Sequence, residues 1–324
     1  NLVEPAPAKP APAAAAPLAP KPPRPPIAPV FGGLQPKDHE QAELFANRLI
    51  KRARHLRRWP TKRGITCFRV YDRDIPEIPL VVERLGNNLH ITEYERPHER
   101  DPGRHAQWLE LMVRTAAQTL DVPIQRAHLK SRVRQLSQYE KVASHKQLTP
   151  VTESGLTFLL NLTDYVDTGL FLDHRQTRQM VRELADGKRF LNLFAYTGSF
   201  TVYAASGGAA ATTTVDLSSN YIDWAQQNLA ANQLTHDRHQ FIVSDTMEFL
   251  NAAAARGDQF DLCVVDPPTF SNSKRADDWD VQTMHGELLN RIAAVMVAGG
   301  VVFFSTNFRR FKIDESALAK FGEV

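Results

Sequence analysis

Five apolar runs of strand length alternate with helix-length segments in the second half of the chain. Buried strands that alternate with helices are typical of a parallel sheet, because each parallel connection needs a crossover and the helix supplies it. The pattern therefore predicts an α/β fold with a doubly wound, Rossmann-like sheet over residues 166–324. The runs are residues 189–194, 212–217, 240–244, 260–266 and 301–306.

The charges of the chain are divided unevenly between its two halves. The 324 residues have a formal net charge of +3. Residues 1–149 hold 25 basic and 15 acidic side chains, a net charge of +10, whereas residues 150–324 hold 14 and 21, a net charge of −7. This division suggests that the first half meets a polyanion while the second half does different chemistry.

The first 30 residues contain 11 prolines and nine alanines. Such a segment has few backbone donors and little to bury, so residues 1–36 are predicted to form an extended linker. Because a linker normally joins two folded bodies, we expect a further domain before Asn1.

Cysteine content and hydropathy indicate the compartment. The two cysteines, Cys67 and Cys263, are too few for a disulfide framework or a four-thiolate metal site. The longest apolar stretch, residues 292–304, is shorter than the roughly 20 residues of a membrane helix. We therefore expect a cytoplasmic protein without a membrane span or a metal centre.

Residues 37–165 are predicted to form a small basic α+β domain that binds RNA. Helices are expected over residues 38–59 and 103–120, and strands over 65–71, 80–94, 126–133 and 156–162. Eight basic side chains without an acidic one fall within sixteen residues of the first helix and its end. A solvated face and a phosphate-binding face are about equally good interpretations of this cluster. Its members are Arg48, Lys51, Arg52, Arg54, Arg57, Arg58, Lys62 and Arg63.

Polar residues follow the strands of the predicted sheet, where ligands of such sheets bind. A single-glycine turn follows the first strand, and its free N–H groups can face a ligand, although a plain strand-to-helix connection explains it equally well. Asp216 can accept both hydroxyls of a ribose, or it can be a helix N-cap. Asp245 can accept hydrogen bonds from an adenine amino group, and Asp266 opens a rigid Pro-Pro loop. Three acids at the ends of successive strands predict a nucleotide-type site.

Together these motifs resemble the class I S-adenosylmethionine-dependent methyltransferases that modify ribosomal RNA. They are the turn Asn192-Leu-Phe-Ala-Tyr-Thr-Gly, the two acids Asp216 and Asp245, and Asp266-Pro-Pro-Thr-Phe-Ser-Asn-Ser-Lys. The match is strongest to the C-terminal part of bifunctional enzymes that make N7- and N2-methylguanine in 23S ribosomal RNA. The resemblance implies S-adenosylmethionine as cofactor, 23S rRNA as substrate and an upstream N2-guanine methyltransferase domain. The cofactor residues that it implies are Asp173, Arg175, Asn192, Phe194, Tyr196, Thr197, Gly198, Asp216, Ser218, Asp245, Thr246 and Asp266.

The methylated atom can be argued from what the site lacks. Methylation at cytosine C5 needs a thiolate, and neither cysteine follows a strand of the predicted sheet. Enzymes that methylate exocyclic amino groups usually have an aromatic residue directly after Pro-Pro, whereas Thr269 intervenes here. Guanine N7 has a lone pair and no proton, so its methylation needs no general base, only in-line positioning and exclusion of water. We expect Asp266, Pro267 and Pro268 to position guanine and Phe270 to lie against it.

Basic residues near the strand ends are candidate RNA contacts, together with the first basic helix. Ribosomal guanines are usually paired, so extrusion of the base, or capture of an RNA before it has folded, is implied. The RNA-binding candidates are Arg48, Lys51, Arg52, Arg54, Lys274, Arg275, Arg309 and Arg310.

Two other functions share parts of this pattern. A nucleotide-dependent dehydrogenase shares the sheet and the ribose acid, but it would need a Gly-x-Gly-x-x-Gly turn. An RNA-binding protein without activity could keep the same fold, and guanine N2 or cytosine C5 remain alternative target atoms. Because class I methyltransferases normally add two strands after the fifth, we also expect this chain to be shortened at its C-terminus.

Overall fold

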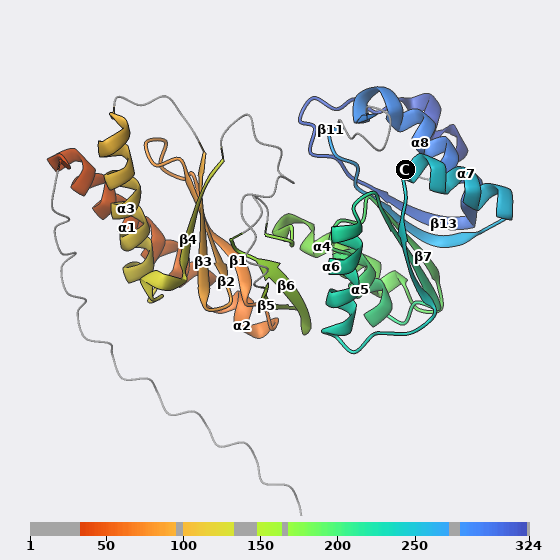
Figure 1. The fold of residues 1–324 in the computed structure, drawn as a ribbon, viewed down its shortest axis with the longest axis horizontal. Coiled ribbons are helices and arrows are strands. Elements are labelled where there is room, and N and C mark those ends of the chain that lie inside the picture. Colours follow the sequence, from red (N-terminus) through yellow and green to blue (C-terminus); the bar gives the residue numbers. More distant parts are fainter. Residues whose placement is uncertain (1–32, 95–99, 133–147, 164–167, 272–278, 323–324) are drawn as a thin grey trace, which may run out of the picture.

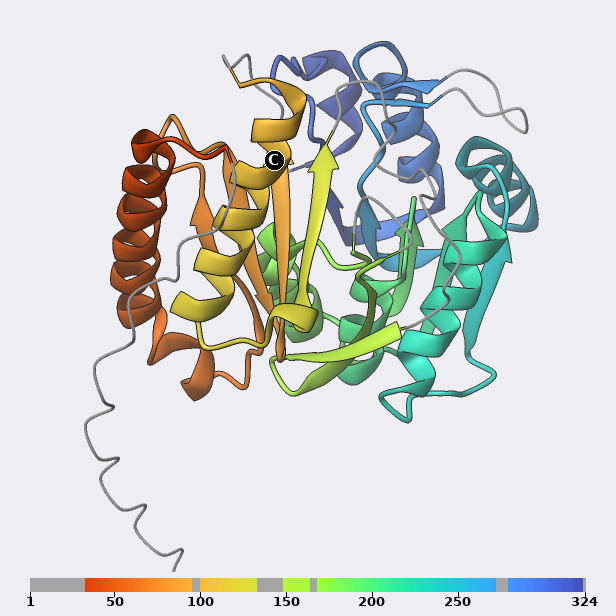
Figure 2. The same ribbon diagram turned by 60° about the vertical axis from the view of Figure 1, so that its left-hand side comes forward.

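A computed structural model of the protein describes residues 33–94, 100–132, 148–163, 168–271 and 279–322. Two bodies stand side by side, with a β-hairpin between them (Figure 1). One is a four-stranded sheet with two helices on one face, and the other is a parallel sheet with helices on both faces. Figure 2 shows the same arrangement after a turn that brings the first body forward.

The first body has the strand order β1-β2-β3-β4, in which β1, β2 and β3 are antiparallel and β4 runs parallel to β3. The helices and strands expected here from the sequence are confirmed, with ends that differ by a few residues. Its elements are α1 (Pro36–Leu56), α2 (Trp59–Lys62), β1 (Cys67–Asp72), β2 (Leu80–Leu85), β3 (Asn88–Tyr94), α3 (Pro102–Thr119), η1 (Ile124–Arg126) and β4 (Ala127–Arg132).

Helix α1 forms because its start and its apolar spacing agree. Pro36 occupies the first turn, and the Asp38 carboxylate accepts a hydrogen bond from the Gln35 N–H at 2.9 Å. Ala42, Phe45 and Leu49, which recur at three- and four-residue spacing, are buried against the sheet and α3. The remaining faces of the helix are therefore left for its charged side chains.

The second body contains five parallel strands in the order β13-β10-β7-β8-β9, which is the expected doubly wound sheet. Helices α4, α5 and α6 lie on one face, and α7 and α8 lie on the other (Figure 1). Its elements are η2 (Leu172–His174), α4 (Arg175–Leu184), β7 (Arg189–Leu193), α5 (Ser199–Ser206), β8 (Ala211–Asp216), α6 (Ser219–Ala230), β9 (His239–Val243), α7 (Thr246–Arg256), β10 (Phe260–Val265), β11 (Phe270–Ser271), β12 (Trp279–Asp280), α8 (Val281–Val295), β13 (Met296–Phe304) and η3 (Glu315–Lys320).

Side-chain alternation along the strands builds a core on each face of this sheet. Leu262 and Val264 of β10 pack toward α4 and α5, whereas Cys263 and Val265 pack toward α7 and α8. The last strand begins five residues earlier than predicted. The pairing of β10 with β13 shifts register where Gly299 adopts φ +75°, so a bulge lets the apolar residues before the glycines join the strand.

The hairpin of β5 (Leu148–Glu153) and β6 (Leu156–Asn161) belongs to a hydrophobic cluster shared by both bodies. Cys67 and Leu85 come from the first sheet, and Tyr203 comes from α5. A continuous core therefore crosses the boundary near residue 165 that the sequence predicts, and the division into domains stays a prediction. Strand β5 itself was not expected from the sequence.

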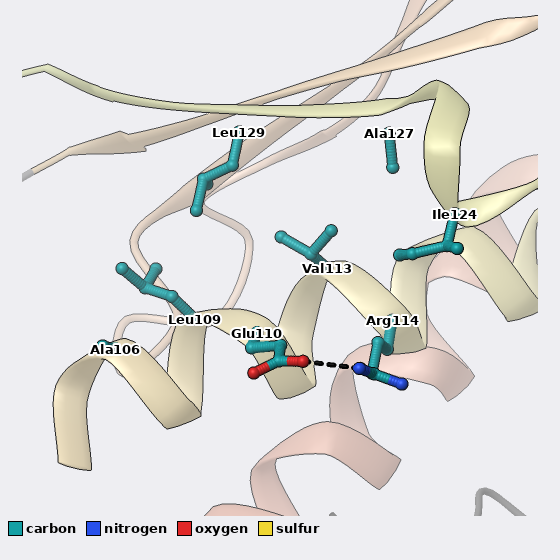
Figure 3. A pocket seen from close by; sticks show the side chains of 8 residues that line it. All are labelled: Ala106, Leu109, Glu110, Val113, Arg114, Ile124, Ala127 and Leu129. Carbon is teal, nitrogen blue, oxygen red and sulfur yellow. Dashed lines mark hydrogen bonds and ion pairs between the residues drawn. The ribbon is translucent and has the colours of Figure 1, made fainter. Parts of the chain in front are cut away.

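A hollow of about 380 Å³ lies between α3 and β4, in the first body (Figure 3). Its lining is largely apolar, and the Glu110–Arg114 ion pair, 2.5 Å long, lies at its edge. It has no set of polar groups that converge on one point, so we place the candidate active site at the ends of the parallel strands instead. The lining residues are Ala106, Leu109, Glu110, Val113, Arg114, Ile124, Ala127 and Leu129.

Candidate active site

The turn after β7 has an unusual backbone. Phe194 and Tyr196 adopt φ of +53° and +50°, and Gly198 adopts +70°. Left-handed conformations are uncommon for residues other than glycine and gather at functional sites, where the surrounding structure enforces them. A Cβ on Gly198 would lie 2.6 Å from the Cβ of Ala225 in α6, so only glycine fits there. The predicted turn thus brings main chain to the edge of the sheet where the strands end.

Asp216, at the end of β8, faces this turn. Its Oδ2 accepts the Tyr196 N–H at 2.8 Å, and its Oδ1 accepts the Ser218 N–H at 2.9 Å. Burial raises the pKa of this carboxyl to about 6, although the two backbone hydrogen bonds act in the opposite direction. Each carboxylate oxygen has a further lone pair, so a ribose diol can still bind. The alternative role as a helix cap belongs to Ser218, whose hydroxyl accepts the Tyr221 N–H.

Aromatic rings surround Tyr196 in the turn. Its ring lies 5.3 Å from that of Phe171 and 4.7 Å from that of Tyr221, and Trp224 is also in contact. Such a group supplies a large apolar surface beside the Asp216 carboxylate. This is the chemistry expected of a site for a nucleoside with an apolar body and a polar sugar.

Two of the predicted cofactor residues act inside the fold. The Asn192 amide donates to the Thr201 hydroxyl at 3.0 Å, and the Thr197 hydroxyl donates to the Gly169 carbonyl at 2.6 Å. Both side chains are about 1% exposed. Both residues support the turn, and the Thr197 carbonyl also accepts a hydrogen bond from the Asn228 amide at 2.8 Å.

Asp245, after β9, is the N-cap of α7. One of its carboxylate oxygens accepts the N–H groups of Met247 and Glu248, and the following Thr246 is buried. Capping uses Oδ1, so Oδ2 is the oxygen through which the predicted adenine contact would be made.

Asp266, after β10, is held from two sides. The Ser305 hydroxyl donates to Oδ1 at 2.5 Å, and His174 Nε2 lies 3.4 Å from Oδ2. Burial and the nearby Asp173 raise the pKa of the Asp266 carboxyl, whereas His174 and Ser305 act in the opposite direction. The sequence analysis missed both His174 and Ser305. Two signals could have located them: His174 stands between the predicted residues Asp173 and Arg175, and Ser305 lies at the end of a strand.

Arg175 is turned away from the strand ends. Its Nε donates to Glu153 at 2.6 Å and its Nη2 to the Cys67 carbonyl at 2.5 Å. These partners lie in the hairpin and in β1, which argues against the predicted cofactor contact and assigns Arg175 to the joint between the two bodies. Asp173, in contrast, is exposed and raises the pKa of the Asp266 carboxyl, and its contact with the cofactor stays a prediction.

The Pro-Pro loop ends in an exposed aromatic side chain. Trp279 Nε1 donates to the Pro268 carbonyl at 2.8 Å and so fixes the loop. Phe270 is 61% exposed, and its ring lies 6.1 Å from that of Phe308 after β13. An exposed aromatic side chain such as Phe270 can stack on a base. Phe308 was not predicted.

The predicted RNA-binding side chains differ in whether they already have a partner within the protein. Arg48 pairs with Asp74 at 2.6 Å and Arg52 donates to the Val70 carbonyl, so both are partly engaged within the protein. Lys51, Arg54, Arg309 and Arg310 are exposed, whereas Lys274 and Arg275 lie outside the described residues.

Four further exposed basic side chains lie at or beside α2, and we call them the α2 basic cluster. The ring of Trp59 in α2 lies 5.2 Å from the guanidinium of Arg175, the residue that follows His174 in the sequence. The cluster therefore lies beside the joint between the two bodies, where Arg175 also contacts Glu153. Its members are Arg57, Arg58, Lys62 and Arg63.

These features define a nucleotide-cofactor site on a Rossmann-like sheet, and comparisons identify its family. A family model described as S-adenosylmethionine-dependent methyltransferase matches residues 72–314. The ribosomal RNA large subunit methyltransferase K of Neisseria meningitidis is 44% identical over 274 residues, 84% of this chain and 77% of that protein. The corresponding K/L protein of Alcanivorax borkumensis is 45% identical over 86% of this chain, which spans 39% of that protein. The chain belongs to the S-adenosylmethionine-dependent methyltransferases, within the family that contains these K and K/L proteins.

Solved structures confirm the fold. A methyltransferase solved with S-adenosylhomocysteine superimposes with a TM-score of 0.73 at 24% identity, and 87% of this chain and 73% of that chain are covered. A methyltransferase from Streptococcus mutans gives a TM-score of 0.71 at 22% identity, with coverage of 91% and 74%.

The cofactor of this family is S-adenosylmethionine, and the residues on the strand edge fit it. The Asp216 carboxylate suits a ribose diol, and the aromatic group suits the apolar parts of the molecule. Among the described residues, no group of three or more His, Cys, Asp or Glu side chains could hold a metal ion. The described helices also include none that is long and apolar enough to cross a membrane.

Proposed function

We propose that the protein transfers the methyl group of S-adenosylmethionine to N7 of a guanine in large-subunit (23S) ribosomal RNA. The observation that carries the proposal is the Asp266 loop, fixed at the end of β10 beside the cofactor residues. The two relatives named above are large-subunit methyltransferases by name, which supports the choice of substrate.

The chemistry of the two cysteines argues against methylation at cytosine C5. Burial raises the pKa of the Cys67 thiol to about 12, with Glu153 acting in the same direction, and burial also raises the pKa of Cys263 far above its usual range. Both thiols are buried, and Cys263 packs within the core between β10 and the helices α7 and α8. A nucleophilic thiolate is therefore missing from the described part of the site.

The residues of this chain have three tasks in the proposed reaction. The cofactor supplies an electrophilic methyl group. Asp216 and the turn after β7 hold the nucleoside, and Phe270 stacks on the extruded guanine. Asp266 orients the base and lies where positive charge develops as N7 accepts the methyl group. Because N7 carries no proton, the residues need not remove one, and exclusion of water by the aromatic side chains is sufficient.

RNA binding is proposed to depend on the basic body. Exposed Lys51 and Arg54 and the α2 basic cluster would contact phosphates, while Arg309 and Arg310 flank the strand ends. We also propose that the protein acts with an N2-guanine methyltransferase domain upstream of the linker. The K/L relative, of which this chain spans 39%, supports this arrangement, and the mass of the native polypeptide tests it.

The direct test is to identify the methylated nucleoside. Purified protein is incubated with methyl-labelled cofactor and unmodified 23S transcript, and the RNA is digested and analysed by mass spectrometry. We expect 7-methylguanosine from the wild type, none from Asp266→Ala, and wild-type activity from the surface control Asp237→Ala.

Each other outcome refutes a specific part of the proposal. N2-methylguanosine or 5-methylcytidine as the product would refute the N7 assignment, and an active Asp266→Ala protein would refute the role of Asp266. Cofactor binding without any transfer would favour the alternative of an RNA-binding protein without activity.

A further inference from the structure

His174 contacts Asp266 although 92 positions separate them in the sequence. The 3₁₀ turn η2 directs the imidazole toward the end of β10, with Nε2 3.4 Å from Oδ2. The His174 and Asp266 side chains are only 16% and 20% exposed. The His174 ring also packs edge-on against Phe200 at 5.7 Å, which limits its rotation. The contact is thus enclosed and oriented.

The two oxygens of Asp266 are held by different elements. Ser305, directly after β13, donates to Oδ1 at 2.5 Å. His174, in η2, approaches the other oxygen, Oδ2. A carboxylate held at both oxygens keeps one orientation while each oxygen retains a lone pair for a substrate. If one of the two contacts were lost, the carboxylate could rotate about its Cβ–Cγ bond.

The segment that carries His174 is itself anchored by a buried acid. Glu153 of the hairpin accepts from Arg175 at 2.6 Å, from Arg178 at 2.7 and 2.9 Å, and from the Tyr203 hydroxyl at 2.9 Å. The side chains of Glu153 and Arg178 are 0% exposed. Desolvation makes buried ion pairs weak contributors to stability, and their best-attested use is to fix one arrangement. The arrangement fixed here is that of η2 and the start of α4.

We propose that His174 is a positioning residue of the methyl-transfer site: it holds the Asp266 carboxylate in its reactive orientation, and Glu153 fixes His174 through Arg175 and Arg178. The inference rests on the proposed function in one respect, that Asp266 faces the substrate base. It does not depend on which atom of the base receives the methyl group.

Two variants of His174 separate its donor nitrogen from its ring. His174→Phe keeps the edge contact with Phe200 but has no donor, and His174→Gln supplies an amide donor in place of Nε2. We expect His174→Phe to lower kcat for total methyl transfer by about 10- to 100-fold, the cost of a misplaced reacting group. The KM for RNA, the Kd for S-adenosylhomocysteine and the Tm should stay close to wild type. His174→Gln should recover most of the rate, and His236→Phe, on an exposed loop, should resemble the wild type.

A second readout does not need an active enzyme. In carboxyl-detected NMR titrations, loss of His174 removes the imidazole that, when protonated, lowers the pKa of Asp266, so this pKa should rise in His174→Phe relative to wild type. This readout distinguishes the inference from the proposed function, which fails on the identity of the product.

Three outcomes would overturn the inference. The first is a His174→Phe protein with the turnover and the Asp266 titration of the wild type. The second is a glutamine variant as slow as the phenylalanine variant, which would mean that the donor is irrelevant. The third is a loss of rate that only follows a loss of Tm. Glu153→Gln extends the test, because it should lower kcat while cofactor affinity is kept.

Discussion

Asp216 allows the clearest test of the cofactor site. Its two oxygens each accept one backbone N–H, and burial raises its pKa to about 6. Replacement by Asn keeps the shape but removes the charge, and it places an NH2 group against one of the two backbone donors. We expect the cofactor to lose charge-assisted hydrogen bonds from its ribose, which contribute about 1.5 to 3 kcal/mol. The Kd should therefore rise about 10- to 150-fold.

The pH dependence of binding gives the same carboxyl a second signature. The folded-state pKa lies above the usual value for Asp, so lowering the pH through about 6 protonates Asp216, which removes its negative charge and weakens it as a hydrogen-bond acceptor. Affinity in the wild type should be full above this value and should fall toward tenfold for each pH unit below it. In Asp216→Asn, which does not titrate, affinity should be nearly flat between pH 5 and 7.

Isothermal titration calorimetry with S-adenosylhomocysteine at several pH values measures both the rise in Kd and its dependence on pH. Asp237→Asn, at an exposed position, serves as the control. The Tm of Asp216→Asn should change little, because relief of a buried charge opposes the lost backbone hydrogen bond. An Asp216→Asn protein that binds as tightly as the wild type, or that keeps the same pH dependence, would refute the assignment of the ribose to this carboxyl.

Three further outcomes follow from single features of the structure. Gly198→Ala combines a left-handed φ with a 2.6 Å contact to Ala225, so it should lower the free energy of unfolding by about 2 kcal/mol or more. Gly257→Ala is the control: its φ is +73° but its surroundings are open, so the loss should be about 1 kcal/mol. Urea titrations measure both values. Arg178→Met leaves Glu153 without its buried partner and should cost about 3 to 5 kcal/mol in the same assay, and a loss below 1 kcal/mol would contradict that role. Alanine at all four positions of the α2 basic cluster should reduce the salt dependence of RNA binding by about 0.7 to 0.9 in log–log slope per lost phosphate contact, and an unchanged slope would remove the cluster from the RNA interface.

The sequence was sufficient to predict elements that depend on local patterns. Alternating apolar runs located the five parallel strands, and three- and four-residue spacing located α1, because both are periodicities of neighbouring residues. The predicted start of β13 was wrong. The bulge at Gly299 depends on the pairing of β13 with β10, which the apolar run of residues 301–306 does not reveal. The acids Asp216 and Asp266 could be located because they end strands.

The contacts that the sequence did not predict join distant segments. His174 approaches Asp266 only after the sheet and η2 have formed, and no local pattern marks that contact. The prediction of Arg175 as a cofactor contact came from the family resemblance and not from a contact that the sequence shows. Its partner Glu153 lies in the hairpin, so only tertiary structure could show that it joins the two bodies.

The division of charge between the two halves of the chain suits the proposed reaction. The acidic strand edge favours a cationic sulfonium and repels phosphate, whereas the α2 basic cluster attracts phosphate to the basic body, beside the Trp59–Arg175 contact. An RNA bound to the basic body would then keep its backbone outside the acidic edge, and an extruded base, which is uncharged, would be the part that enters. The same charge pattern that we propose to bind the RNA would thereby restrict the active site to the base, and Phe270 and Asp266 are the side chains proposed to meet that base.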